Sequence, residues 1–227
     1  MLKCFIKSIL TLFLLAATTA TLASTYTFNQ ITTNGSTGVG AQLQMDVTNS
    51  GGNALFTFSN NIGIASSITD IYFDYGNTNY FTSISNNVLG SAGDSTGVNF
   101  SDGASPANLP AGNTVGFSAD FGADSNSPTL SNGVNAAGEW VAFLGTLSQG
   151  SSFSQVLAAI DSGALRVGLH VQGIEVISQH GFDERFEIET ESESFVNGTP
   201  NAVPLPAAAW LFGSALLGFV GFKRREG

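Results

Sequence analysis

The strongest constraint on the fold is a period-two alternation of apolar and polar residues, which recurs through the middle of the chain. Successive side chains of a β-strand point to opposite faces, so this period is typical of strands that bury one face. The alternating segments are 43–47, 54–58, 115–121, 140–144 and 165–171. The Gly-rich residues 49–53 separate the first two segments and predict a hairpin turn.

One segment of the middle departs from this period. Ser152 and Gln155 have the spacing of a capping box ahead of the apolar residues 156–160, and Gly163 is a typical helix stop. The stretch 86–113 is rich in Asn, Gly, Ser and Pro and predicts long loops. Many short strands, small-residue turns and one short helix favour an antiparallel β-sandwich of jelly-roll or immunoglobulin-like type.

The N-terminal segment 1–23 has the order of a signal peptide, with two lysines ahead of a short apolar run and small residues at its end. We expect Sec-type export and cleavage by signal peptidase between Ala23 and Ser24. An uncleaved anchor is the alternative, which the short apolar run disfavours. The β-sandwich domain is then expected at 24–190, followed by an extended linker at 191–202.

The C-terminal segment 205–222 contains no charged residue. At ~1.5 Å per residue, a helix of this length would measure about 27 Å, which is close to the thickness of a hydrocarbon core. We therefore predict a transmembrane helix there. The basic cluster Lys223, Arg224 and Arg225 follows it and predicts a cytoplasmic C-terminus, so that the precursor would cross the inner membrane once.

A proline-containing motif precedes this helix. It consists of Val203, Pro204, Leu205, Pro206 and Ala207. The motif, the apolar helix and the terminal basic cluster together resemble the PEP-CTERM sorting signal in its VPLPA variant, over residues 203–227. The resemblance implies processing by an exosortase-type membrane protease and delivery to the cell surface or the extracellular space, in organisms that make exopolysaccharide and biofilm matrix. A plain uncleaved anchor is the alternative.

The charge of the middle segment is strongly acidic. Of the seven Lys and Arg residues only Arg166 and Arg185 lie there, together with every acidic residue except Glu226. Such a domain has no basic patch to displace phosphate counterions, so we expect no nucleic-acid partner. The single cysteine, Cys4, lies in the leader, which excludes disulfides and thiolate metal sites from the exported domain.

The sequence contains few candidate catalytic residues. Gly93 to Gly97 matches the Gly-x-Ser-x-Gly nucleophile pattern around Ser95, but its polar neighbours predict a loop rather than a strand–helix elbow. His170 and His180 are the only histidines, and we expect both at the surface. The chain is therefore expected not to be an enzyme, with a secreted hydrolase of unidentified site as an alternative.

Oxygen ligands occur at loop-compatible spacing in Asp120, Asp124 and Asn126, and again in Asp70, Asp74 and Asn77. Calcium prefers such ligands, although neither set has the EF-hand order. Turn formation is the favoured interpretation. A calcium-dependent adhesion or carbohydrate-binding module remains a further alternative, and no other cofactor is expected.

Two more patterns bear on partners. Glutamates alternate along 187–193, which is typical of a solvated edge strand guarded against aggregation. Tyr72, Tyr75, Tyr80 and Phe81 lie close in sequence and suggest an aromatic platform for sugars, although core packing explains most phenylalanines. We expect a non-enzymatic surface or matrix protein that contacts exopolysaccharide.

Overall fold

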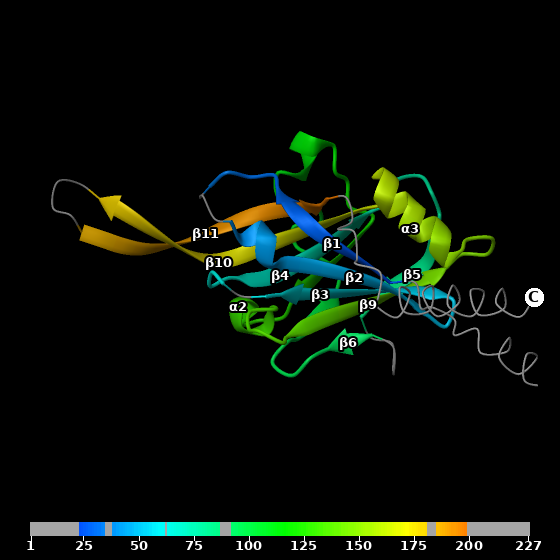
Figure 1. Cartoon of the computed structure of the whole chain (residues 1–227), viewed down its shortest axis with the longest axis horizontal. Coiled ribbons are helices and arrows are strands. Elements are labelled where there is room, and N and C mark those ends of the chain that lie inside the picture. The colour runs from blue at the N-terminus through cyan, green and yellow to red at the C-terminus, as the bar shows by residue number, and fades with distance from the viewer. Residues whose placement is uncertain (1–22, 35–37, 62, 87–91, 181–184, 199–227) are drawn as a thin grey trace, which may run out of the picture.

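The computed structural model describes residues 23–34, 38–61, 63–86, 92–180 and 185–198 (Figure 1). The first strands are β1 (Ala23–Gln30), β2 (Leu43–Ser50), β3 (Asn53–Asn60), β4 (Ser67–Asp74), β5 (Phe81–Ser85) and β6 (Gly93–Asp94). They are followed by β7 (Phe100–Asp102), β8 (Phe121–Ser125), β9 (Trp140–Leu147), β10 (Arg166–His180) and β11 (Arg185–Asn197). The helices among the described residues are η1 (Val39–Gln42), η2 (Gly112–Val115), α2 (Thr129–Asn132) and α3 (Phe153–Ser162).

All these strands belong to one antiparallel sheet that is nearly closed into a barrel (Figure 1). Its order is β5-β9-β3-β2-β1-β11-β10-β4-β8-β7, with β6 paired to β9. β1 joins the two halves, because residues 23–27 pair with β2 and residues 28–30 pair with β11. The mainly antiparallel β fold predicted from the alternation is confirmed.

Polar side chains link the two ends of the sheet, β5 with β6 and β7, between which the described residues form no closing strand pair. Asn86 is buried and donates to Asp94 Oδ1 at 3.3 Å and to the Phe100 carbonyl at 3.1 Å. Asp102 of β7 accepts from the Ser85 hydroxyl at 2.7 Å, at the end of β5. We call residues 85, 86, 94, 100 and 102 the polar seam. Its side-chain hydrogen bonds lie where backbone hydrogen bonds between two strands would otherwise close the sheet.

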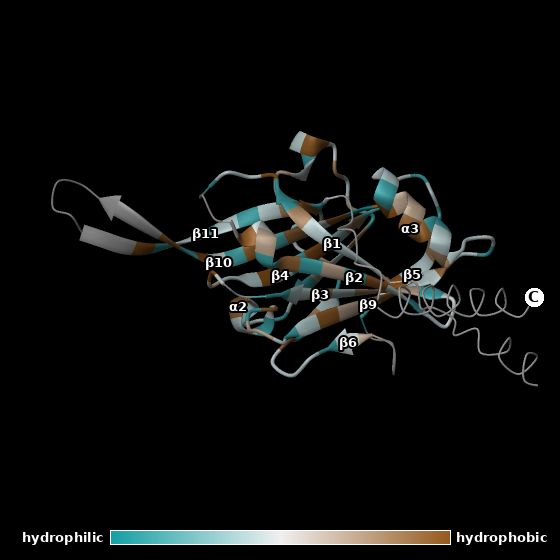
Figure 2. Ribbon diagram, in the orientation of Figure 1, coloured by the Kyte–Doolittle hydropathy of each residue, from teal (hydrophilic) through white to brown (hydrophobic). Residues whose placement is uncertain are grey.

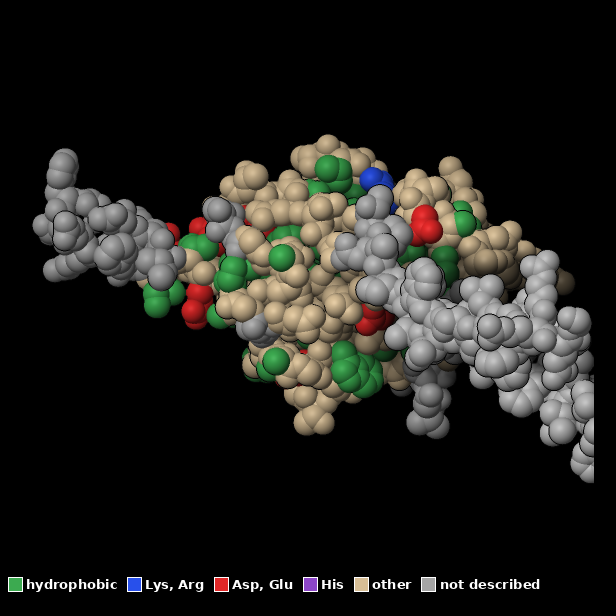
Figure 3. Space-filling model, in the orientation of Figure 1, with side chains coloured by type: hydrophobic (Ala, Val, Ile, Leu, Met, Phe, Trp, Pro, Cys, Tyr) green, Lys and Arg blue, Asp and Glu red, His purple; other side chains and the backbone are tan. Residues whose placement is uncertain are grey.

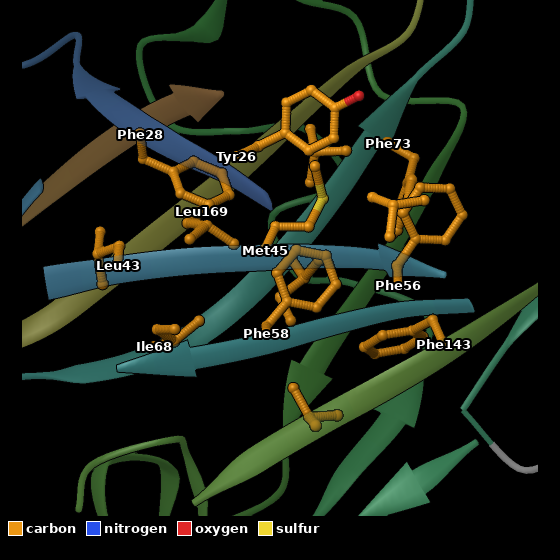
Figure 4. Packing of buried hydrophobic residues seen from close by; sticks show 14 of the residues in the cluster. Tyr26, Phe28, Leu43, Met45, Phe56, Phe58, Ile68, Phe73, Phe143 and Leu169 are labelled. Atoms are coloured by element: carbon orange, nitrogen blue, oxygen red, sulfur yellow. The ribbon is translucent and has the colours of Figure 1, made fainter. Parts of the chain in front are cut away.

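The inner face of the curled sheet buries one aromatic-rich core (Figure 4). Phe73 of β4 lies at its centre, with its ring centroid 5.0 Å from that of Phe56 and 6.3 Å from that of Phe143, both edge-on. Edge-to-face packing suits the positive rim and negative face of aromatic rings. Buried and partly exposed residues alternate along β2 and β3, as the sequence pattern predicted, and both strands can be followed in Figure 2. β9 differs from the prediction, because its residues 141–145 are all buried.

Two local predictions are confirmed. Ser152 caps α3 and forms the expected capping box with Gln155, and Gly163 ends the helix at φ 74°. β2 and β3 form the expected hairpin, whose turn is Gly51 and Gly52 at φ 61° and 89°. Left-handed φ at both turn positions matches the right-handed twist of the flanking strands.

Three segments differ from expectation. The segment predicted as a strand at 115–121 is one only from Phe121, because Gly116 adopts a left-handed φ of 65° and turns the chain over the outer face of the sheet. The stretch 86–113 contains β6 and β7. Residues 191–197, expected as a linker, form the second half of β11, where Phe195 is completely buried.

The distal halves of β10 and β11 form a two-stranded arm that projects from the body (Figure 1). They pair from Ile174 to His180 and from Arg185 to Glu191, beyond an irregularity in β10 between Val171 and Ile174. The acidic run was expected at a sheet edge. Its first half lies on the arm, but Glu193 is buried in the body. Figure 3 shows acidic side chains gathered where the arm leaves the body.

Candidate functional site

A row of polar side chains crosses three neighbouring strands on the outer face of the sheet. His170 of β10 lies opposite Asp70 of β4, and Asp70 lies opposite Asp124 of β8. Their neighbours Leu169, Ile71 and Ala123 point into the core, which places the polar row on the other face. Directly opposite residues of antiparallel strands are close enough to interact, so the register itself assembles this site.

Asp70 and His170 form a buried pair. The Nδ1 atom of His170 lies 3.0 Å from Asp70 Oδ2, and the two side chains are only 13% and 7% exposed. The Thr69 hydroxyl donates to the same oxygen at 2.6 Å. Burial raises the pKa of Asp70, but the hydrogen bonds from His170 and Thr69 outweigh it and leave this pKa below its ordinary value. His170 was expected at the surface, and that prediction is wrong because a carboxylate on the next strand holds it against the sheet.

Asp124 behaves in the opposite way. Burial and the neighbouring Asp70 carboxylate raise the pKa of Asp124 to about 6, although the Ser105 amide donates to its Oδ2 at 2.7 Å. Its Oδ1 atom is buried and has no hydrogen-bond partner among the described residues. Two carboxylates that share a site do not both ionise readily, so Asp124 is the member of this pair that holds a proton near pH 6.

A loop covers the row on one side. Residues 103–119 fold over the sheet and bury a second apolar cluster of Tyr72, Leu109, Phe117 and Val196. Gly122 permits this approach, because a Cβ there would lie 2.6 Å from the Cβ of Ala104. The Tyr72 hydroxyl donates to the Pro106 carbonyl at 3.0 Å and ties the loop to β4.

A pocket of about 340 Å³ lies beside the row, at the irregularity in β10. Its lining consists of Ala65, Ser66, Ser67, Leu130, Ser131, Asn135, Gln172 and Gly173. Gln172 belongs to both features, because its side-chain amide lies 3.2 Å from His170 Nδ1. The pocket therefore has uncharged walls, and the hydrogen-bonded pair of His170 and Asp70 lies beside them.

The other predicted site residues are not brought into this site. The Ser95 hydroxyl accepts a hydrogen bond from the Trp140 amide at 2.8 Å, at the junction of β6 and β9. This contact fixes the turn after β6. The described side-chain hydrogen bonds of His170 are to Asp70 and Gln172, not to Ser95. The backbone of His180 ends β10, and its side chain lies outside the described part of the structure.

The three candidate calcium ligands face different partners. Asp120 accepts from the Tyr75 and Gly76 amides at 2.8 and 2.9 Å, which makes it a turn-stabilising residue. Asp124 joins the polar row, and Asn126 donates to Asn99 Oδ1 at 2.8 Å. The described residues contain no group of three or more His, Cys, Asp or Glu side chains arranged to hold a metal ion.

The aromatic residues suggested as a sugar platform do not share a surface. Tyr72 lies under the covering loop and Phe81 is 5% exposed in the main core. Tyr75 and Tyr80 are half-buried and pack against that core. Packing, rather than a ligand, accounts for these side chains.

The predicted targeting sites lie outside the described residues, except Ala23 and Ser24, which are the first residues of β1. The sorting motif 203–207, the helix 205–222 and the basic cluster all lie beyond residue 198. Within the described ranges, no helix combines the length and the apolar character needed to cross a membrane.

Comparisons with known proteins give no relative: no family model, curated protein or solved structure matches the chain. The site therefore rests on geometry alone. The sequence patterns single out Asp70, Asp124 and His170 separately and do not predict that they lie together. Their proximity depends on the pairing of β4 with both β10 and β8, which no local sequence pattern indicates.

Proposed function

We propose that the chain is an exported, non-enzymatic cell-surface or matrix protein, delivered by Sec-type export and sorted by an exosortase-type protease. The carrying observation is the tripartite C-terminal segment 203–227, in which a Pro-x-Pro motif, an uncharged run and three basic residues follow one another. The last strand, β11, ends at Asn197, ahead of this segment, and a mature N-terminus at Ser24 would leave the β1–β2 pairing from Ser24 to Thr27 intact.

The proposed role of the β domain is to contact matrix polysaccharide outside the cell. In this proposal the two halves of the curled sheet act as the layers of a sandwich, with a jelly-roll or immunoglobulin-like character. An acidic and thiol-free body suits an exported protein that stays soluble in an oxidising environment.

Intact-mass analysis of the protein from membrane, surface and medium fractions of the native host tests this proposal. We expect an N-terminus at Ser24 and loss of the C-terminal basic cluster. Replacing Pro204 and Pro206 together by Ala should leave export unchanged but retain the tail, because the motif and not the apolar run would be read by the protease. A mature protein that still carries Met1 in the cytosol would refute the proposal.

A secreted hydrolase is the second candidate, favoured by one observation: a carboxylate orients His170 beside a pocket. Asp70 would hold the imidazole in one orientation, as an acidic partner does for a general base. Assays of the full chain on ester and glycoside substrates, compared with His170→Gln, test it. Activity lost in the variant would support this candidate, and no turnover of any substrate would remove it.

A further inference from the structure

We propose that the pocket at the irregularity of β10 binds an uncharged sugar residue. The claim depends on the proposed function, because a matrix polysaccharide is met only outside the cell, and it deepens that function by naming the binding site and ligand class. The pocket volume of about 340 Å³ lies at the lower end of the ~300–1,000 Å³ range of small-molecule sites.

The first argument is that α2 lies at the pocket although none of its side chains is buried in the core. This helix buries none of its residues, and Leu130 is 48% exposed. Even so, Ser67 and Asn135 both donate side-chain hydrogen bonds to the Leu130 carbonyl, at 2.9 and 2.7 Å. Leu130 is thus an exposed apolar side chain with a fixed backbone, which suits it to contact the apolar face of a ligand ring.

The part of the wall formed by Gly173 and Ser66 is also held in a fixed conformation. Gly173 adopts a left-handed φ of 64°, and a Cβ at this position would lie 3.2 Å from the Leu130 side chain. Ser66 is held by a buried amide network, in which Gln42 Nε2 donates to its hydroxyl at 3.0 Å and Asn60 Nδ2 lies 3.2 Å from the same oxygen. A pocket whose walls are fixed in the free protein loses little entropy on binding.

The second argument concerns charge. No lining residue is charged, and the ion pair of Arg166 with Asp74 is on the far side of the polar row, four residues away on each strand. An anionic ligand would find no cation on the walls and would be repelled by the acidic body. The polar groups of the walls are hydroxyls and carboxamides, which suit a ligand with many hydroxyl groups.

The third argument is that the pocket offers no open strand edge. β10 pairs with β4 on one side and with β11 on the other, and β4 is bridged to Val134 through Ile68 on its second side. An extended peptide that recognises proteins by strand addition needs such an edge. Recognition here depends on side chains, which favours a compact polyol over a peptide.

Gln172 is the most informative polar group of the site. Its Nε2 atom lies 3.2 Å from His170 Nδ1, which in turn lies 3.0 Å from Asp70 Oδ2. Because the NH₂ group of Gln172 faces His170, the amide oxygen of this pocket residue is the atom suited to accept a hydrogen bond from a ligand hydroxyl.

The test uses the full chain in detergent micelles and hexasaccharides of glucose, galactose and N-acetylglucosamine, with oligogalacturonate and a polar peptide as comparisons. Saturation-transfer NMR identifies binding, and calorimetry measures affinity. We expect at least one neutral hexasaccharide to bind, and Leu130→Ala and Gln172→Ala each to weaken it about tenfold, the effect of one lost hydrogen bond or apolar contact. Val115→Ala, which truncates an exposed apolar residue on η2, should change nothing.

Ser131→Tyr provides an independent variant, because Ser131 is exposed and a larger side chain there fills the pocket from outside. Loss of binding in this variant, with an unchanged melting temperature, supports the proposal. It is overturned if no neutral hexasaccharide binds, if only oligogalacturonate or the peptide binds, or if the pocket variants bind like the unaltered chain. A correctly exported and processed protein that binds no sugar would overturn this inference alone, whereas sugar binding by an unprocessed cytosolic protein would overturn the proposed function alone.

Discussion

At the scale of single residues, Asp70 and Asp124 show how different neighbours shift the pKa of two chemically identical side chains in opposite directions. Both aspartates are held on the same face of the sheet. Asp70 is stabilised as a carboxylate by His170 and Thr69, so its pKa is lowered even though burial opposes this. Asp124 lacks such donors at Oδ1 and has its pKa raised. The two residues therefore make opposite predictions for stability.

Asp124→Asn should stabilise the protein at neutral pH. Folding raises the pKa of Asp124 from 3.8 to about 6, so the folded protein binds a proton more tightly between these values and loses stability as the pH rises through them. A neutral amide removes this loss. Melting temperatures at pH 4 and pH 7 should show the variant above the unaltered protein at pH 7, and the difference should shrink at pH 4.

Asp70→Asn is the matched control with the opposite sign. A lowered pKa contributes stability above 3.8 that is lost as the pH falls. The substitution also replaces the charged oxygen that contacts Thr69 and His170 by a neutral amide. This variant should melt below the unaltered protein at pH 7. Equal shifts of the same sign in both variants would contradict the assignment of roles.

At the scale of elements, α3 is the clearest case in which local sequence determines local structure. Ser152 and Gln155 bond each other's backbone, and the buried face of the helix is Phe153, Val156, Ala159 and Ile160. The capping groups and the apolar spacing both lie within a few residues, so they can be recognised in the sequence without knowing which distant residues the helix contacts. The two-stranded arm of β10 and β11 differs from α3, because its length depends on how far two strands from different parts of the sequence remain paired.

Ser152→Ala should cost about 1 kcal/mol of unfolding free energy, because it removes the N-cap hydroxyl that accepts from the Gln155 amide and so disrupts the capping box. Urea denaturation measures this loss. Ser118→Ala, at an exposed serine outside any helix, is the control and should change the unfolding free energy far less. Equal effects at the two positions would argue against a capping role.

At the scale of the whole molecule, the fold depends on one aromatic core and one polar seam. Phe73 contacts four rings, those of Phe56, Phe58, Phe121 and Phe143, from strands in both halves of the sheet. A residue in this position holds the halves together. The seam at Asn86 does the same at the open edges, where strand pairing ends.

Phe73→Ala should cost about 3–5 kcal/mol, because it removes buried aromatic surface and leaves a cavity between the halves. Phe73→Leu retains much of the volume and should cost clearly less. Both are measured by chemical denaturation, and a loss for Ala no greater than for Leu would contradict the central role of this ring.

Asn86→Ala should lower stability by about 1–3 kcal/mol, because it leaves the buried Phe100 carbonyl without a donor. Hydrogen exchange of the β7 amides should become faster as the seam loosens, while exchange in β2 and β3 should not change. Asn113→Ala, at an exposed position of η2, is the control. Unaltered exchange in β7 would show that the seam does not hold the edges.

The β class, the β2–β3 hairpin and the cap of α3 followed from the sequence, because period, turn residues and capping groups act over a few positions. The polar row, the second half of β11 and the fold of 115–120 did not follow. The alternation at 115–121 is equally compatible with a strand and with a loop that buries Phe117, and Gly116 decided between them.

What the sequence determined by itself is therefore local: the positions of several strands and of one helix. Only the tertiary structure decided that His170, Asp70 and Asp124 would meet and that a pocket would open beside them. The physical reason is that strand partners are chosen by burying one common core, a condition that involves residues a hundred positions apart and has no signature in any short segment.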